Sequence, residues 1–71
     1  MDNRGEKMRY KILKEVNTFI DENGFSPTVR EIGSLVGLRS SSTVFYHLEI
    51  LEELGKIKKH PNISRSIIVK K

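Results

Sequence analysis

The chain has 71 residues, enough for one domain with a modest core and too few for a deep, fully walled substrate cavity. It contains no cysteine, so neither disulfides nor thiolate–zinc sites can hold it together, and hydrophobic packing has to do so. The longest apolar run, Ile67-Ile68-Val69, is far shorter than the roughly 20 residues of a membrane span. The first five residues lack the apolar stretch of a signal peptide, and we expect a cytoplasmic protein without membrane contact.

The net charge of +4 is distributed unevenly along the chain. From Gly55 to Lys71 there are six basic residues and no acidic one. Such a segment suits a polyanion, because neutralising phosphate groups releases condensed counterions. Solvated lysines that keep the protein soluble are the alternative, and charge alone favours this alternative.

A first helix is predicted over residues 6–22, because apolar residues recur there at helical spacing. Asn23-Gly24 supplies the stop, since glycine readily adopts the left-handed conformation beyond the last turn. The apolar residues are Met8, Ile12, Leu13, Val16, Phe19 and Ile20.

A second helix is predicted over residues 28–36, after the extended connector Phe25-Ser26-Pro27. Thr28 and Glu31 have the spacing of a capping box, in which the hydroxyl accepts from the amide of Glu31 and the carboxylate accepts from the amide of Thr28. The stripe expected to be buried consists of Val29, Ile32, Leu35 and Val36.

Two glycines suggest a sharp turn after this helix. Gly33 costs the helix about 1 kcal/mol relative to alanine, and we expect it to permit the close approach of another helix. Gly37 then ends the helix, and Leu38 can make the apolar contact that accompanies a glycine stop. Together these features indicate a helix-turn-helix.

A third helix is predicted over residues 41–54, with Ser40 or Ser41 as its N-cap and Gly55 as its stop. The residues expected to face the core from this helix are Val44, Leu48, Leu51 and Leu54.

Residues 56–69 predict a two-stranded hairpin, because stretches rich in Ile and Val flank Pro61-Asn62, a pair that favours a turn. A lone hairpin is marginally stable in water and must pack on the helices. The predicted fold is therefore mainly α with a small β-hairpin, a three-helix winged helix-turn-helix that forms a single domain over residues 1–71.

The exposed face of the third helix has two halves. Opposite the core stripe, its first two turns are uncharged, hydroxyl-bearing and aromatic, whereas its last two turns carry Glu49 and Glu53. A recognition helix enters the major groove of DNA with its N-terminal half, where short polar and aromatic side chains contact base edges and thymine methyl groups. The N-terminal amides can bind a phosphate, and Arg39 can reinforce that contact.

Each candidate also has a plainer explanation. Phe45 lies near the core edge, where packing against the first helix or the wing explains it as well as DNA contact does. Tyr46 lies nearly opposite the core, which favours a role in surface binding, and His47 is expected to be structural and hydrogen-bonded. The hairpin cations that can reach phosphates, or can simply be solvated, are Lys58, Lys59 and Arg65.

The motif PT-REI, which starts at Pro27, is followed by VGL-SSSTV--HL--LE--G-I, which starts at Val36, and together they resemble the N-terminal DNA-binding domain of LexA repressors. The resemblance implies repression of DNA-damage response genes, the SOS response, by a dimer bound to a palindromic operator in double-stranded DNA. The base-reading residues that it implies are Ser40, Ser42, Thr43, Phe45 and Tyr46. The residues that it and the basic wing imply for the DNA backbone are Thr28, Arg30, Arg39, Ser41, Lys58, Lys59 and Arg65.

In the resembled family, the main dimer interface and a self-cleaving Ser-Lys peptidase lie in a C-terminal domain. This chain ends at Lys71, so no serine or lysine is assigned that role, and we expect it not to be an enzyme. It shows no metal-ligand cluster and no phosphate-binding glycine loop, so we expect neither a metal nor a cofactor. Phe45 and Tyr46 are bulky where relatives often carry small or polar residues, and the operator sequence therefore does not transfer.

The alternative function is a winged-helix module that binds another protein. The aromatic and acidic side chains on the exposed face of the third helix motivate this alternative.

Overall fold

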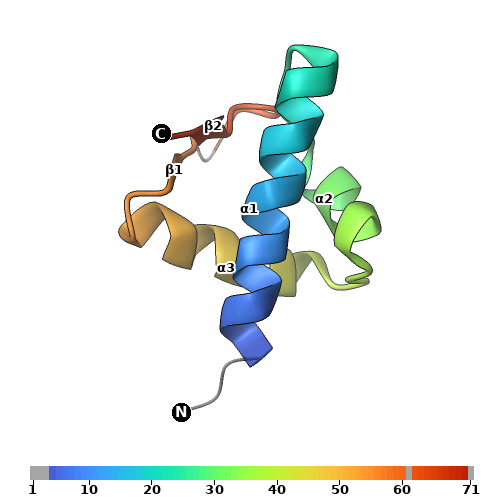
Figure 1. Ribbon diagram of the computed structural model, residues 1–71, viewed down its shortest axis with the longest axis vertical. Helices are drawn as coiled ribbons and strands as arrows, with labels where there is room; N and C mark the ends of the chain where they lie inside the picture. The colour runs from blue at the N-terminus through green and yellow to red at the C-terminus, as the bar shows by residue number, and fades with distance from the viewer. Residues whose placement is uncertain (1–3, 61, 71) are drawn as a thin grey trace.

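Residues 4–60 and 62–70, which the computed structural model describes, form three helices and two short strands. Residues 1–3, 61 and 71 lie outside the described residues, and with them Pro61 of the predicted turn. The elements are α1 Arg4–Asn23, α2 Val29–Val36, α3 Ser41–Glu53, β1 Ile57–Lys58 and β2 Ile68–Val69. In Figure 1, α1 stands upright across the molecule, with α2 on one side and the strands on the other. The predicted fold class is confirmed.

Helix α1 ends as predicted, through Asn23 and Gly24. The side-chain amide of Asn23 donates to the carbonyl of Phe19 at 2.9 Å, and the N–H of Gly24 donates to the carbonyl of Ile20 at 2.8 Å. Gly24 has φ +80°, the left-handed conformation that closes the last turn. These contacts extend α1 to Asn23, one residue beyond the predicted end.

The capping box at the start of α2 is confirmed. The N–H of Glu31 donates to Thr28 Oγ1 at 3.1 Å, and the N–H of Thr28 donates to Glu31 Oε1 at 2.8 Å. At the other end, Gly37 has φ +78°, and its N–H and that of Leu38 both donate to the carbonyl of Gly33. The helix therefore starts and stops on bonds between residues close together in the sequence.

Gly33 is needed for a close approach, but not the one that the sequence suggested. A Cβ atom at this position would lie 2.8 Å from the carbonyl oxygen of Leu38, in the turn, and 3.7 Å from Val44 Cγ2 on α3. Only the first contact is too short for an alanine. Helix α3 does approach Gly33, through Val44, but the contact that requires a glycine is the one with the backbone of the turn.

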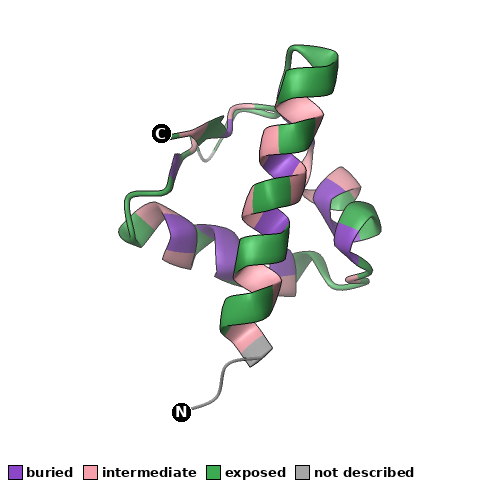
Figure 2. Ribbon diagram, viewed as in Figure 1, coloured by how far each residue is buried: buried purple, intermediate pink, exposed green. Residues whose placement is uncertain are grey.

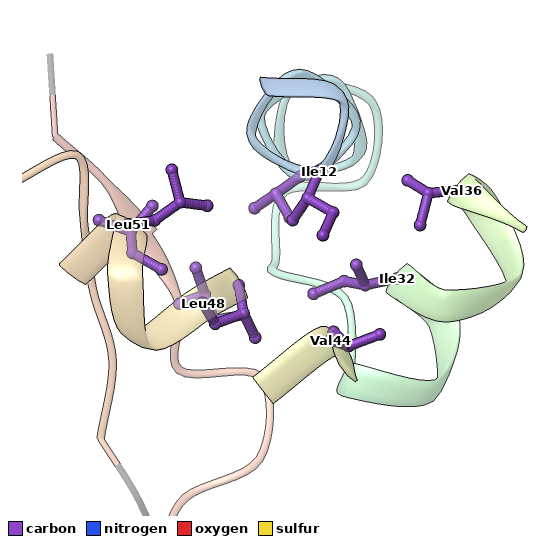
Figure 3. Packing of buried hydrophobic residues seen from close by; sticks show 9 residues of the cluster. Ile12, Ile32, Val36, Val44, Leu48 and Leu51 are labelled. Atoms are coloured by element: carbon purple, nitrogen blue, oxygen red, sulfur yellow. The ribbon is translucent and has the colours of Figure 1, made fainter. Parts of the chain in front are cut away.

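The core forms where one side of α1 meets α2 and α3. In Figure 3, Ile12 of α1, Ile32 of α2 and Leu48 of α3 point toward one another. Burying a side chain of this size contributes about 1.5–3 kcal/mol. Figure 2 shows that each helix has a covered side and an open side. The buried apolar residues are Ile12, Val16, Ile32, Val36, Val44, Leu48, Leu51, Ile57 and Ile67.

Two leucines that were predicted to face the core are exposed. Leu35 is 42% exposed, because it lies about 60° from Ile32 around α2, on the side away from Val36. Leu54 is 62% exposed, because α3 ends at Glu53 and the chain then turns away toward β1. In both cases the apolar spacing continues past the area that α1 covers.

The strands are shorter than the hairpin predicted over residues 56–69. Ile57 pairs with Val69 and Lys58 with Ile68 in an antiparallel register, and each strand has two residues. The ladder stops there because the N–H of His60, which would make the next ladder bond, donates at 3.1 Å to Ser66 Oγ and not to a backbone carbonyl. The segment between the strands is a loop, which we call the wing loop (residues 59–67).

None of the helices in the described ranges is long and apolar enough to cross a membrane.

Candidate nucleic-acid interface

The N-terminus of α3 is built by a serine cap. Ser40 has an extended backbone, and its Oγ accepts from the N–H of Thr43 at 3.4 Å, as a residue of this type at an N-cap does. Ser41 and Ser42, which follow it, are exposed, and neither they nor Ser40 carries charge. The first turn of α3 therefore presents hydroxyl groups and helix N-terminal amides to solvent.

The next turn presents two aromatic rings. Phe45 is 46% exposed and Tyr46 is 57% exposed, whereas Val44 and Leu48 beside them are buried. The Tyr46 ring meets the His47 ring edge-on, with centroids 5.3 Å apart. Thr43 is only half-exposed. The face predicted to read bases thus exists, with Ser42, Phe45 and Tyr46 open to solvent.

A groove of about 490 Å³ separates the start of α2 and the middle of α3 from the wing loop. Phe45 lies in its wall together with the α2 cap, so the packing expected for this ring is only partial, and much of it is exposed. The predicted site residues that the groove brings together are Thr28, Arg30, Phe45, Lys59 and Arg65.

A second groove, of about 580 Å³, follows the turn between α2 and α3. It brings Arg30 together with three further predicted residues, which are Arg39, Ser40 and Ser41. Arg30 lines both grooves, and it is exposed near the N-terminus of α2. Four predicted residues line neither groove and lie on open surface or at its edge: Ser42, Thr43, Tyr46 and Lys58.

Two of the predicted wing cations have carboxylate partners. The ammonium of Lys59 lies 3.6 Å from Glu52 Oε1, and the Lys59 side chain is only 16% exposed. The guanidinium of Arg65 donates to both carboxylate oxygens of Glu31, at 2.9 and 3.0 Å. Lys58, in contrast, is exposed on β1. The three cations that the sequence grouped together therefore differ in how free their charged ends are.

Sequence reasoning missed the residues that hold the wing loop. Glu31 was recognised as a cap, but its partner Arg65 is 34 residues away in the chain. Ser26 is 4% exposed and accepts from an amide 41 residues away. No local pattern shows such pairs, and the only signal is that Ser26 is a polar residue next to the buried Pro27.

The two shifted ionisable groups have different causes. The pKa of Glu31 is lowered, first by the hydrogen bonds from Arg65 and then by that from the backbone of Thr28.

The pKa of His47 is lowered, first by burial and then by the positive charge of Arg9. His47 is 5% exposed, and within the described residues its Nδ1 has no hydrogen-bond partner. Its burial fits the structural role predicted for it, whereas the predicted hydrogen bond is not formed at Nδ1.

Among the described residues, no group of three or more His, Asp or Glu side chains is placed to hold a metal ion. The site is built from hydroxyl groups, exposed rings, helix N-termini and cations, which are the groups that contact bases and phosphates.

A glycine turn joins α2 to α3, the first half of α3 is uncharged and exposed, and a small antiparallel wing packs beside them. These features define a winged helix-turn-helix DNA-binding domain. A model of the LexA DNA binding domain family matches residues 7–66. The chain belongs to this family, which confirms the resemblance that the sequence motif suggested.

Known proteins of similar sequence are bacterial LexA repressors. The LexA repressor of Bifidobacterium longum (strain DJO10A) is 46% identical over 59 residues, which are 83% of this chain and 24% of the relative. That of Desulfitobacterium hafniense (strain Y51) is 50% identical over 56 residues, 79% of this chain and 28% of the relative. That of Ligilactobacillus salivarius (strain UCC118) is 44% identical over 64 residues, which are 90% of this chain and 31% of the relative. The chain thus spans 24–31% of the length of these relatives.

Proposed function

We propose that this domain recognises an operator in double-stranded DNA as the DNA-reading part of a transcriptional repressor of the SOS type, acting in the bacterial cytoplasm. The observation that carries the proposal is the exposed, uncharged N-terminal half of α3, bordered by two grooves that basic residues line. The family match and the bacterial repressors named above support it.

In this proposal, α3 enters the major groove with its N-terminus first. The short hydroxyl side chains at its start can donate to and accept from base edges, and the two rings can contact thymine methyl groups. The acidic residues Glu49 and Glu53 are exposed on the last turns of α3, where they would repel phosphates. The helix therefore has to tilt so that these turns leave the groove. The residues assigned to bases are Ser40, Ser42, Thr43, Phe45 and Tyr46.

The DNA backbone is assigned to the surfaces on both sides of α3. The N-termini of α2 and α3 place amides where a phosphate binds well, and Arg30 and Arg39 lie beside them in the two grooves. Lys58 is the exposed cation of the wing, and Lys59 can reach a phosphate if it leaves Glu52. The other residues assigned to the backbone are Thr28 and Ser41.

The symmetry of the operator is part of the same proposal. We assign this chain one half-site of a palindrome, occupied as a homodimer whose main interface lies outside residues 1–71. The support is the length of the relatives, of which the matched region is 24–31%. A self-cleaving peptidase, if the full protein has one, would lie outside the matched region in the same way.

Selection from random duplexes tests the proposal. The chain should enrich a defined half-site, and its affinity for that site should fall steeply as salt rises, because phosphate contacts release counterions. If no duplex is enriched, and none binds at low salt, the proposal fails. Binding to a protein with little salt dependence would then favour the protein-interaction alternative.

A pair of tyrosines identifies the reading face. Tyr46→Ala should weaken binding to the selected site by about tenfold and binding to random duplex much less. Tyr10→Ala is the matched control, because Tyr10 is 58% exposed on α1 and lines neither groove. Competition binding with labelled duplex measures both variants. Equal losses for selected and random duplexes in Tyr46→Ala would remove Tyr46 from the base-reading set.

A further inference from the structure

The contact that joins the wing loop to the rest of the domain is centred on Arg65. Its guanidinium donates through Nη1 to Glu31 Oε1 at 2.9 Å and through Nη2 to Glu31 Oε2 at 3.0 Å. Nη1 also donates to the carbonyl of Ser26 at 3.1 Å, and the guanidinium carbon lies 4.9 Å from the centroid of the Phe25 ring. A bidentate pair fixes orientation as well as distance, because the guanidinium fork is planar.

The partner carboxylate has a second task. Glu31 Oε1 also accepts from the N–H of Thr28 at 2.8 Å, which is half of the capping box at the start of α2. One side chain thus starts the first helix of the helix-turn-helix and holds the wing loop. The wing cation and the end of α2 that lines both grooves therefore bond to the same carboxylate.

A second bond holds the same stretch of the wing loop. The N–H of Ile67 donates to Ser26 Oγ at 3.2 Å in the buried interior. Ser26 therefore receives one bond on its carbonyl from Arg65 and one on its hydroxyl from Ile67. Two residues of the wing loop are fixed to the residue that lies two positions before the α2 cap.

The backbone of Arg65 is under strain. Its φ is +56°, the left-handed region, and Arg65 is the one non-glycine residue with positive φ in the described ranges. This conformation is unfavourable for a residue with a Cβ atom, which approaches the following carbonyl oxygen too closely. Such strain persists only where surrounding contacts over-determine the conformation, and the bonds to Glu31 and Ser26 do so here.

We propose that the Glu31–Arg65 pair is a latch that positions the wing against the helix-turn-helix, so that Arg65 supports DNA binding through Glu31 and not by contacting a phosphate. The inference rests on the proposed function, and it replaces the phosphate contact that the sequence suggested for Arg65. Arg65 and Glu31 are positioning residues in this account.

Neutralising Glu31 separates the latch from simple electrostatics. Glu31→Gln keeps an amide oxygen that can accept from Thr28, so the capping box survives, while the ion pair is lost. On Coulomb's law alone, removing a negative charge strengthens binding to a polyanion. The latch predicts the opposite change, which is weaker DNA binding by Glu31→Gln.

The experiment measures the Kd of the 71-residue chain for its selected duplex and for a random duplex. Glu31→Gln should bind the selected duplex about tenfold more weakly. Glu53→Gln, the matched control, removes the same charge from an exposed residue at the end of α3 and should bind as wild type or slightly tighter. Amide hydrogen exchange at Ile67 should be faster in Glu31→Gln than in wild type. If Glu31→Gln binds as tightly as wild type, or tighter, the latch is wrong.

The Arg65 variants decide between a latch and a phosphate contact. Arg65→Lys keeps the positive charge and loses the bidentate fork. A latch predicts that this variant binds DNA as weakly as Arg65→Gln, whereas a phosphate contact predicts near wild-type binding.

The double variant Glu31→Gln with Arg65→Gln should bind DNA no more weakly than Arg65→Gln alone, because both residues act through one interaction. Additive losses would contradict this. Thermal melting confirms folding, and Arg65→Lys decides if Glu31→Gln does not fold.

The experiments distinguish a failure of the proposed function from a failure of the latch. If wild type enriches no duplex, the proposed function fails before any variant is compared. If wild type enriches a site and Arg65→Lys retains its affinity, the domain binds DNA and only the latch is wrong.

Discussion

The helix-turn-helix and the wing are stabilised by contacts of very different range. The caps of α2 and α3 are bonds between residues three positions apart, at Thr28 with Glu31 and at Ser40 with Thr43. The wing loop is held by bonds that span 34 to 41 residues, from Arg65 and Ile67 to Glu31 and Ser26. The first region can form its turns from neighbouring residues, whereas the second takes its shape only after the chain has folded back.

Gly33→Ala should produce the largest effect, and it tests the short-range contacts that shape the turn of the helix-turn-helix. Alanine is a better helix former by about 1 kcal/mol. Its Cβ atom, however, would lie 2.8 Å from the Leu38 carbonyl, so the turn has to move. We expect a net loss of about 2 kcal/mol in the free energy of unfolding, since crowding of this kind costs about 1–3 kcal/mol and the neighbour is backbone. Denaturant unfolding measures it.

Ser34→Ala is the matched control for this prediction. Ser34 is the next residue of α2 and is exposed, so alanine gains helix propensity there without a clash. Its stability should stay within about 0.5 kcal/mol of wild type. If Gly33→Ala were as stable as Ser34→Ala, the turn backbone would not be what requires glycine.

Ser26→Ala should have a smaller effect, and it tests the long-range contacts that hold the wing loop. The buried N–H of Ile67 would lose its acceptor, and an unsatisfied buried donor costs about 1–3 kcal/mol. We expect about 1 kcal/mol in unfolding free energy, because the wing loop can open locally and hydrate this amide. Hydrogen exchange at Ile67 should therefore accelerate more than exchange in the core of α1.

Ser66→Ala provides the comparison within the wing loop. Ser66 Oγ accepts from the N–H of His60 and donates to its carbonyl, both at 3.1 Å and both in exposed positions. Water can replace these bonds, so the loss should be no more than about 0.5 kcal/mol. An equal loss in Ser26→Ala and Ser66→Ala would show that burial of the Ile67 bond contributes nothing.

The same difference in range explains which features the sequence could predict. The capping box at Thr28 and the stops at Gly24 and Gly37 depend on a few neighbouring residues and were predicted. The cap of α3 is Ser40, one of the two serines that were predicted for this position. The exposed face of α3 followed from helical periodicity, so the positions of Phe45 and Tyr46 were also predictable.

The errors fall where distant residues decide. Periodicity placed Leu35 and Leu54 in the core, but burial depends on what α1 covers. The wing was expected to be a regular hairpin, because nothing near residues 59–67 shows that this segment bonds to Ser26 and Glu31. The ion pair of Arg65 was also missed, because its carboxylate partner is 34 residues away.

Acidification should have the smallest effect on stability. It distinguishes the helical region from the wing, because the buried imidazole of His47 belongs to the helical region. Burial of His47 and the charge of Arg9 lower the pKa of His47 below its ordinary value of 6.5, so the folded state favours the neutral ring. The unfolded chain binds the proton more readily. Stability is therefore full above about pH 6.5 and falls as the pH drops below that value toward the lowered pKa of the folded state.

His47→Phe tests this explanation, because it keeps an aromatic ring and removes the titrating nitrogens. Denaturant unfolding at pH 7.5 and at pH 5.5 should show a loss in wild type and a much smaller one in the variant, whatever their absolute stabilities. His60 in the wing loop is exposed and remains in both proteins, so its contribution cancels. The carboxylate of Glu31 has a lowered pKa and loses its ion pair only at lower pH, below this window. An equal loss in both proteins would place the acid sensitivity outside the contact between α1 and α3, and the helical region would then carry no pH-sensitive element that the wing lacks.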